Sequence, residues 1–68
     1  MISDESTLLS YGEAALFLNL PRGTLYAMVS QKRIPHVRLG GRLVRFRRRD
    51  LELWIAANSV SAAGAFPT

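Results

Sequence analysis

Two adjacent glycines, Gly40 and Gly41, stand between two short runs in which arginine alternates with apolar residues. The run before them reads HVRL and the run after them reads RLVRF. Alternation with a period of two is typical of half-buried strands, and a glycine pair supplies the positive φ angles that tight hairpin turns require. The pattern therefore predicts a β-hairpin that turns at the two glycines.

The length of the turn decides which side chains of this hairpin face the core. A two-residue turn would pair Val37 with Val44 and Arg38 with Leu43. The buried face would then hold Val37, Val44 and Phe46, and the outward face would hold Arg38 and Arg45. A longer loop would slip the register by one residue and reverse the faces.

Helical signals precede the hairpin. Ser10 and Glu13 have the spacing of a capping box, and an apolar stripe follows them, so we expect a helix over about residues 11–18. Asn19 suits the left-handed conformation that ends a helix. Pro21 suits a first helical position, and a second helix should start there. That helix should end before Pro35, because the residue before a proline favours extended geometry.

The second helix has two different faces. Leu25, Met28 and Val29 recur at helical spacing and predict the core side. The opposite side carries Gly23, Tyr26, Ala27 and Ser30, with Arg22 at its edge. Two short helices joined by about three residues are the helix-turn-helix pattern, which is a weak signal by itself.

A third helix is predicted near residues 49–57. Asp50 lies in its first turn, where the helix dipole favours negative charge, and Leu51, Trp54 and Ile55 should line its core side. The predicted fold is mainly α with a small β-hairpin, in the order α-α-β-β-α. We expect a flexible N-terminus over residues 1–8, the domain over 9–57, and a C-terminal tail over 58–68 in which Val60 and Phe66 could dock.

The charge of the chain is unevenly distributed. All nine basic residues lie between Arg22 and Arg49, and that span contains no Asp or Glu, whereas the five acids lie outside it. A basic field of this kind attracts polyanions, so nucleic acid is the first candidate partner and an anionic membrane surface the second. The alternative is a solvated charged face without a ligand.

Other functions have little support in the sequence. The chain has no cysteine and one histidine, and it has no glycine-rich phosphate loop, so we expect no enzyme, no cofactor and no metal site. His36 has no acidic neighbour in sequence and should be an exposed strand residue. No apolar run spans a membrane and the N-terminus is not a signal peptide, so we expect a cytoplasmic protein of a bacterial host nucleoid.

Several motifs in this order and spacing resemble the excisionase-type, MerR-related winged helix-turn-helix domain, from Leu9 to Ile55. The motifs are Glu-Ala-Ala before Leu18, Arg-x-Thr-Leu-Tyr at 22–26, Ile-Pro-x-Val-Arg-Leu-Gly-Gly-Arg at 34–42, and Arg-Arg-x-Asp-Leu-x-x-Trp-Ile at 47–55. The resemblance implies a recognition helix in the major groove of DNA and a wing in the adjacent minor groove. Carried over to this chain, the helix candidates are Arg22, Gly23, Thr24, Tyr26 and Ala27, and the wing candidates are Arg38, Arg42, Arg45 and Arg47.

The chain departs from the resembled pattern at four positions. Pro21 stands where a capping Ser or Thr is common, and Ala27 where a polar or basic residue is common. Lys32 stands where glycine is common, and Leu16 is an apolar residue at a usually polar position on the first helix.

Three functional hypotheses follow from the resemblance and the charge. The first is an excisionase, or recombination directionality factor, that binds and bends double-stranded DNA with an integrase and with neighbouring copies of itself, while being a monomer off DNA. The second is a small transcriptional regulator of prophage or mobile-element genes. The third is a protein-interaction module, such as an antitoxin, that uses Leu16 and the apolar tail.

Overall fold

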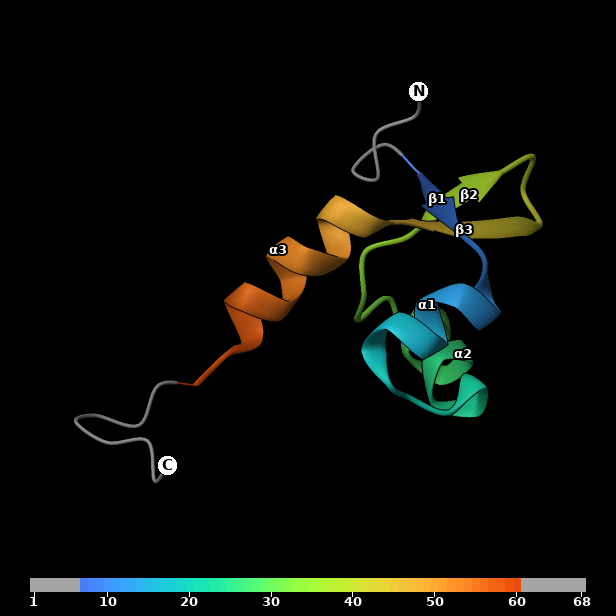
Figure 1. Cartoon of the computed structure of the whole chain (residues 1–68). Helices are drawn as coiled ribbons and strands as arrows, with labels where there is room; N and C mark the ends of the chain where they lie inside the picture. The colour runs from blue at the N-terminus through green and yellow to red at the C-terminus, as the bar shows by residue number, and fades with distance from the viewer. Residues whose placement is uncertain (1–6, 61–68) are drawn as a thin grey trace.

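A computed structural model describes residues 7–60 of the chain, and it contains three helices and a small antiparallel sheet (Figure 1). The predicted order α-α-β-β-α is confirmed, and a two-residue strand that the sequence analysis did not predict precedes it. Val60 was expected to dock but is 85% exposed, and Phe66 with the rest of 61–68 lies outside the described residues. The elements are β1 (Leu8–Leu9), α1 (Tyr11–Leu18), α2 (Arg22–Ser30), β2 (Val37–Leu39), β3 (Leu43–Arg47) and α3 (Arg48–Asn58).

Both ends of α1 are fixed by its own sequence. The Glu13 backbone N–H donates to Ser10 Oγ at 3.2 Å, and the Ser10 backbone N–H donates to Glu13 Oε1 at 2.9 Å, which completes the expected capping box. At the other end Asn19 has φ of 58°, in the left-handed region. The backbone N–H of Leu20 donates to the Ala15 carbonyl at 2.9 Å, so the last turn closes as a Schellman motif.

The helix α2 begins at Arg22, one residue later than predicted, because Pro21 is its N-cap in extended geometry. No side chain caps this end, which follows from the absence of a hydroxyl or amide at Pro21. The C-terminal end is a second Schellman motif: the backbone N–H of Arg33 donates to the Met28 carbonyl at 2.8 Å and that of Lys32 to the Val29 carbonyl at 2.9 Å. Lys32 occupies its left-handed position, with φ of 57°.

The sheet has the order β1-β3-β2, so β3 is central. The turn between β2 and β3 holds three residues, Gly40 to Arg42, and Leu39 lies opposite Leu43. The predicted pairing of Val37 with Val44 is therefore wrong by one residue. Both glycines have positive φ, 66° and 90°, as a hairpin turn requires, but two such residues fit a two-residue and a three-residue loop equally well.

The one-residue slip separates side chains that the two-residue turn would place together. Val37 lies opposite Arg45, and Arg38 lies opposite Val44. Val44 and Phe46 are buried as predicted, whereas Val37 is only half-buried, on the other face of the hairpin. Arg38 and Arg45 consequently lie on opposite faces and not together on one outward face, as had been predicted.

The core is small and apolar, and every element except the two short strands β1 and β2 contributes to it. Within residues 7–60, no polar or charged residue is buried. Phe46, Leu25 and Leu51 are the largest side chains that are fully enclosed. The buried cluster consists of Ala14, Ala15, Leu25, Val29, Ile34, Val44, Phe46 and Leu51.

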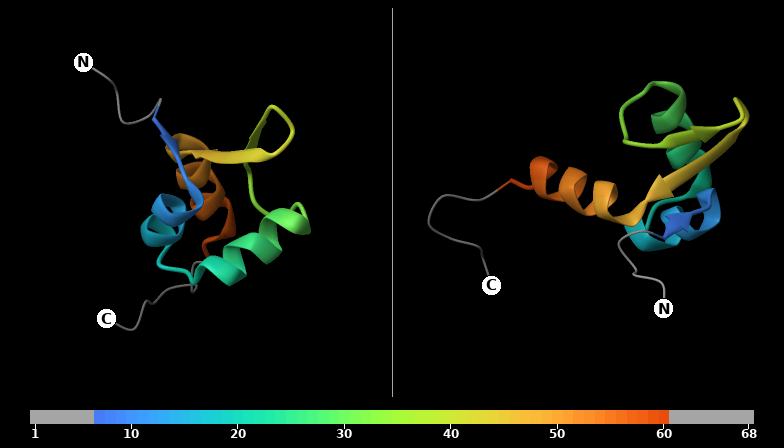
Figure 2. Two further views of the ribbon diagram at one scale, coloured as in Figure 1. Left: turned by 90° about the vertical axis from the view of Figure 1, so that its right-hand side faces the viewer. Right: turned by 90° about the horizontal axis from the view of Figure 1, so that it is seen from above.

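The helix α3 packs through its first half and points away from the tip of the hairpin (Figures 1 and 2). Leu51 is fully buried, but Trp54 is half-buried and Ile55 is 41% exposed, so the prediction that Ile55 lies in the core is wrong. The reason is that α3 extends past the sheet against which its first turns pack. The Trp54 indole N–H donates to the Arg33 carbonyl at 3.2 Å, which ties α3 to the segment after α2.

Candidate nucleic-acid interface

The outward face of α2 presents the residues expected of a recognition helix. Leu25 and Val29 are buried and fix the inward face against the core. The five candidate contact residues are all exposed: Arg22, Gly23, Thr24, Tyr26 and Ala27. The absence of large side chains at Gly23 and Ala27 leaves a surface that can approach a groove closely.

Arg22 lies against the first turn of α1. A methyl group added at Gly12 would overlap Nη2 of the Arg22 guanidinium and would stand 3.2 Å from Cζ and 3.4 Å from Nε. The guanidinium therefore lies beside the Gly12 backbone, in space that a Cβ at this position would share. Sequence patterns did not predict this contact, because it depends on how the two helices cross.

Tyr26 is held from one side by a row of rings. The Tyr11 ring lies with its centroid 4.3 Å from that of Tyr26, at an interplanar angle of 56°. Tyr11 also meets Phe46 edge-on, at 5.4 Å and 74°. Since Phe46 is fully buried and Tyr26 is 47% exposed, the row runs from the core strand β3 to the surface of α2.

The hairpin forms a wing whose tip carries basic residues. Arg38 and Arg42 are exposed, and Arg45 is half-buried with its Nη1 donating to the Val44 carbonyl at 2.8 Å. No ion pair within the described part of the chain involves any of these three arginines or Arg22. Their charge is thus available to an external anion.

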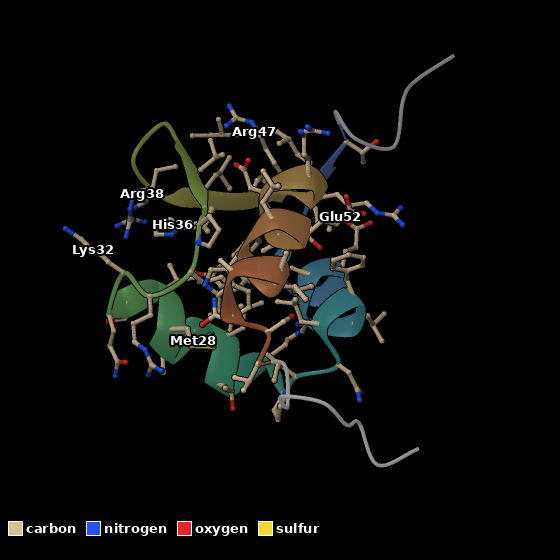
Figure 3. All side chains as sticks on the ribbon, turned by 90° about the vertical axis from the view of Figure 1, so that its left-hand side faces the viewer. Met28, Lys32, His36, Arg38, Arg47 and Glu52 are labelled. Carbon is tan, nitrogen blue, oxygen red and sulfur yellow. The ribbon has the colours of Figure 1, made fainter. Side chains whose placement is uncertain are left out.

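The structure does not bring Arg47 together with the wing tip. Arg47 ends β3, lies opposite Leu8 of β1, and forms an ion pair with Asp50 at 3.5 Å. The next residue, Arg48, pairs with Glu52 at 3.5 Å and places its guanidinium 5.2 Å from the centre of the Phe17 ring. Figure 3 shows Arg47 and Arg38 at different edges of the molecule.

The comparisons with known proteins agree with this geometry. A family model described as a helix-turn-helix domain matches residues 8–59. The chain belongs to the helix-turn-helix domain family. Neither the curated proteins nor the solved structures gave a significant match.

Membership of the helix-turn-helix domain family indicates DNA binding, in which the second helix of the motif enters the major groove. The second helix of the motif in this chain is α2. Among residues 7–60, no three His, Asp or Glu side chains gather to hold a metal ion. No helix in the same range is long and apolar enough to cross a membrane.

Two further residues of this helix-turn-helix domain, Lys32 and His36, have placements that the sequence analysis did not predict. Lys32, at the end of α2, points to the same side of the molecule as Arg38 (Figure 3), so it extends the basic surface between the helix and the wing. His36 was expected to be an exposed strand residue but is half-buried in the segment before β2. Its Nδ1 lies 2.8 Å from the Ile34 carbonyl, and it donates there because a carbonyl only accepts.

Proposed function

We propose that this helix-turn-helix protein binds double-stranded DNA with α2 in the major groove and the β2–β3 wing at the adjacent minor groove. The observation that carries the proposal is the exposed, acid-free surface that α2 shares with the wing. Figure 2 (left) shows the hairpin above the C-terminal end of α2, with α3 behind. One approaching duplex could therefore meet both elements.

The wing arginines supply most of the affinity in this proposal. Arg38, Arg42 and Arg45 neutralise phosphates and release condensed counterions. Three such contacts give a salt slope of about −2.7, so affinity should fall about 40-fold between roughly 50 and 200 mM salt. Because Arg38 and Arg45 lie on opposite faces of the hairpin, the wing offers one cation to each wall of a narrow groove. Narrow minor grooves favour A·T-rich sequence.

Sequence preference comes from α2. Arg22 can make paired hydrogen bonds to a guanine edge, Tyr26 presents a hydroxyl, and the Ala27 methyl can contact a thymine methyl. We expect Arg22→Ala to relax the preference at one base position while leaving non-specific binding nearly intact. A selection of binding sites from random DNA measures this directly, and a profile identical to that of the wild type would refute the assignment of α2.

We further propose that the protein is an excisionase-type accessory factor that assembles in copies along DNA and assists an integrase. The support is the resemblance of its motifs together with the few base-reading side chains of one module, which imply modest affinity for a single site. Several copies bound side by side would compensate for the modest affinity of one copy, because each copy would add the phosphate contacts of its own wing.

Footprinting on the native attachment or promoter region, at rising protein concentration, tests this role. Protection that spreads in regular steps supports cooperative assembly, and a neighbouring integrase gene would add to it. A single isolated footprint favours the transcriptional regulator instead. Failure to bind DNA at low salt would refute both and would favour a protein-interaction role, for which Leu16 on α1, 84% exposed, is one available apolar residue.

A further inference from the structure

We propose that Tyr11 and Gly12, in the first turn of α1, are positioning residues that fix the two base-reading side chains of α2. Gly12 fixes the Arg22 guanidinium and Tyr11 fixes the Tyr26 ring. The purpose of this restraint, base reading, rests on the proposed DNA-binding function, whereas the contacts themselves do not depend on it.

Gly12 acts by its missing side chain. The Arg22 guanidinium occupies the volume that a Cβ at residue 12 would need, with Cζ only 3.2 Å from that point. Glycine within a helix is unfavourable relative to alanine, so helix formation by itself does not favour Gly12. The contrast within the chain is Gly23, where an added methyl would meet nothing within 4 Å.

Tyr11 acts by its ring. It lies between the fully buried Phe46 and the half-exposed Tyr26, and it contacts both. Phe46 cannot move without disturbing the core. Because Tyr11 packs against Phe46, it restrains Tyr26 relative to β3. Tyr26 stays 47% exposed beside this contact, so part of its side chain remains open to a ligand.

The two contacts form a matched pair. Arg22 and Tyr26 are four residues apart on α2 and hence lie on the same side of that helix. Tyr11 and Gly12 are consecutive on α1, so a single helical turn restrains both side chains before DNA arrives. Restraint in advance lowers the entropy lost on binding and sharpens the difference between a correct and an incorrect base.

A double-mutant cycle tests the role of Gly12. Gly12→Ala pushes the flexible end of Arg22 aside and should lower the ratio of specific to non-specific affinity about 3- to 10-fold, the range expected for releasing one side chain. Arg22→Ala should lower the ratio at least as much. In the Arg22→Ala background, Gly12→Ala should have no further effect. The inference is overturned if Gly12→Ala leaves the ratio unchanged, or lowers it equally when Arg22 is absent.

Loss of folding must be separated from loss of positioning. Gly12→Ala should not lower the thermal midpoint, because the displaced group is the end of a flexible side chain and alanine favours the helix. Gly23→Ala, measured for stability alone, gives the gain in thermal midpoint expected from replacing a helical glycine by alanine where no side chain is displaced. A marked destabilisation by Gly12→Ala, without one by Gly23→Ala, would show a packing role and overturn the inference.

The role of Tyr11 is tested by conservative rescue. Tyr11→Phe keeps the ring and should keep the base preference, whereas Tyr11→Leu should lower the specificity ratio in the wild type but not in a Tyr26→Ala background. Equal behaviour of the Phe and Leu variants would refute the positioning role of the ring.

A DNA-free measurement separates failure of this inference from failure of the proposed function. The NMR signal of the Arg22 Nε–Hε group should be shifted from the signals of the exposed Arg38 and Arg42, and it should join them in Gly12→Ala. If the wild type binds no DNA, this result still supports the restraint of Arg22. If Arg22 already resembles the exposed arginines in the wild type, the restraint is absent and the inference fails.

Discussion

Lys32 offers a test of the fold in which one residue change has a calculable effect. It is an L-residue at the left-handed position of the Schellman motif that ends α2, with φ of 57°. A left-handed conformation costs an L-residue with a Cβ roughly 1–2 kcal/mol. Replacing Lys32 by glycine removes this strain and keeps the backbone N–H that donates to the Val29 carbonyl at 2.9 Å.

The gain from Lys32→Gly is smaller than the strain it removes. Glycine gives the unfolded chain more freedom, which offsets roughly 0.4–1 kcal/mol. The net stabilisation should be about 0.5–1 kcal/mol. A domain of this size gains about 4–8 °C in thermal midpoint per kcal/mol, so the midpoint should rise by about 2–8 °C. Helical circular dichroism during heating and during urea titration measures both quantities.

Lys32→Ala is the control, since it removes the same charge from the basic surface while keeping a Cβ. The reasoning is refuted if Lys32→Ala stabilises as much as Lys32→Gly, because the gain would then come from charge relief. Asn19→Gly gives a second comparison at the matching position of α1. Asparagine tolerates the left-handed region better than lysine, so the gain there should be smaller.

Three other changes test different layers of the structure. Ser10→Ala removes one half of the capping box and should lower the free energy of unfolding by about 1 kcal/mol, measured by urea titration. Leu25→Ala empties a fully buried position and should cost about 2–5 kcal/mol, enough to leave much of the protein unfolded in a proton NMR spectrum at room temperature. Arg45→Ala should weaken binding to every DNA sequence and reduce the salt slope by about 0.9, and an unchanged slope in fluorescence anisotropy would contradict its role in the wing.

The features that the sequence predicted best are those that a few neighbouring residues decide. The capping box at Ser10 and Glu13 and the left-handed Asn19 follow from side chains that bond to their own local backbone or tolerate its geometry. Likewise Leu25 and Val29 lie on the buried face because helical periodicity alone selects them. In each case the signal and the structure it specifies lie within one or two helical turns.

The hairpin register shows where local signals end. Gly40 and Gly41 predict a turn, and the burial of Val44 and Phe46 fixes the faces of β3, which is the central strand. Nothing local decides whether Arg42 belongs to the loop or to β3. The strand β1 is similarly hidden, because two residues are too few to show a period, and its pairing with Arg47 is visible only in the folded sheet.

Contacts between helices and strands are harder to predict from sequence patterns than local structure is, and such contacts determine where the side chains of the candidate site lie. The five candidate contact residues of α2 are all exposed, but exposure does not show where a long side chain rests. The Arg22 guanidinium rests on Gly12 because the first turns of α1 and α2 come together at that point. In the sequence, such a contact shows only as a glycine within a helix, where glycine is an unfavourable residue. Gly23 is also a helical glycine but has open space around it, so a glycine by itself does not reveal whether another side chain packs against it. In the proposed DNA-binding mode, residues outside α2 thus contribute to specificity, at positions that only the packing of the two helices reveals.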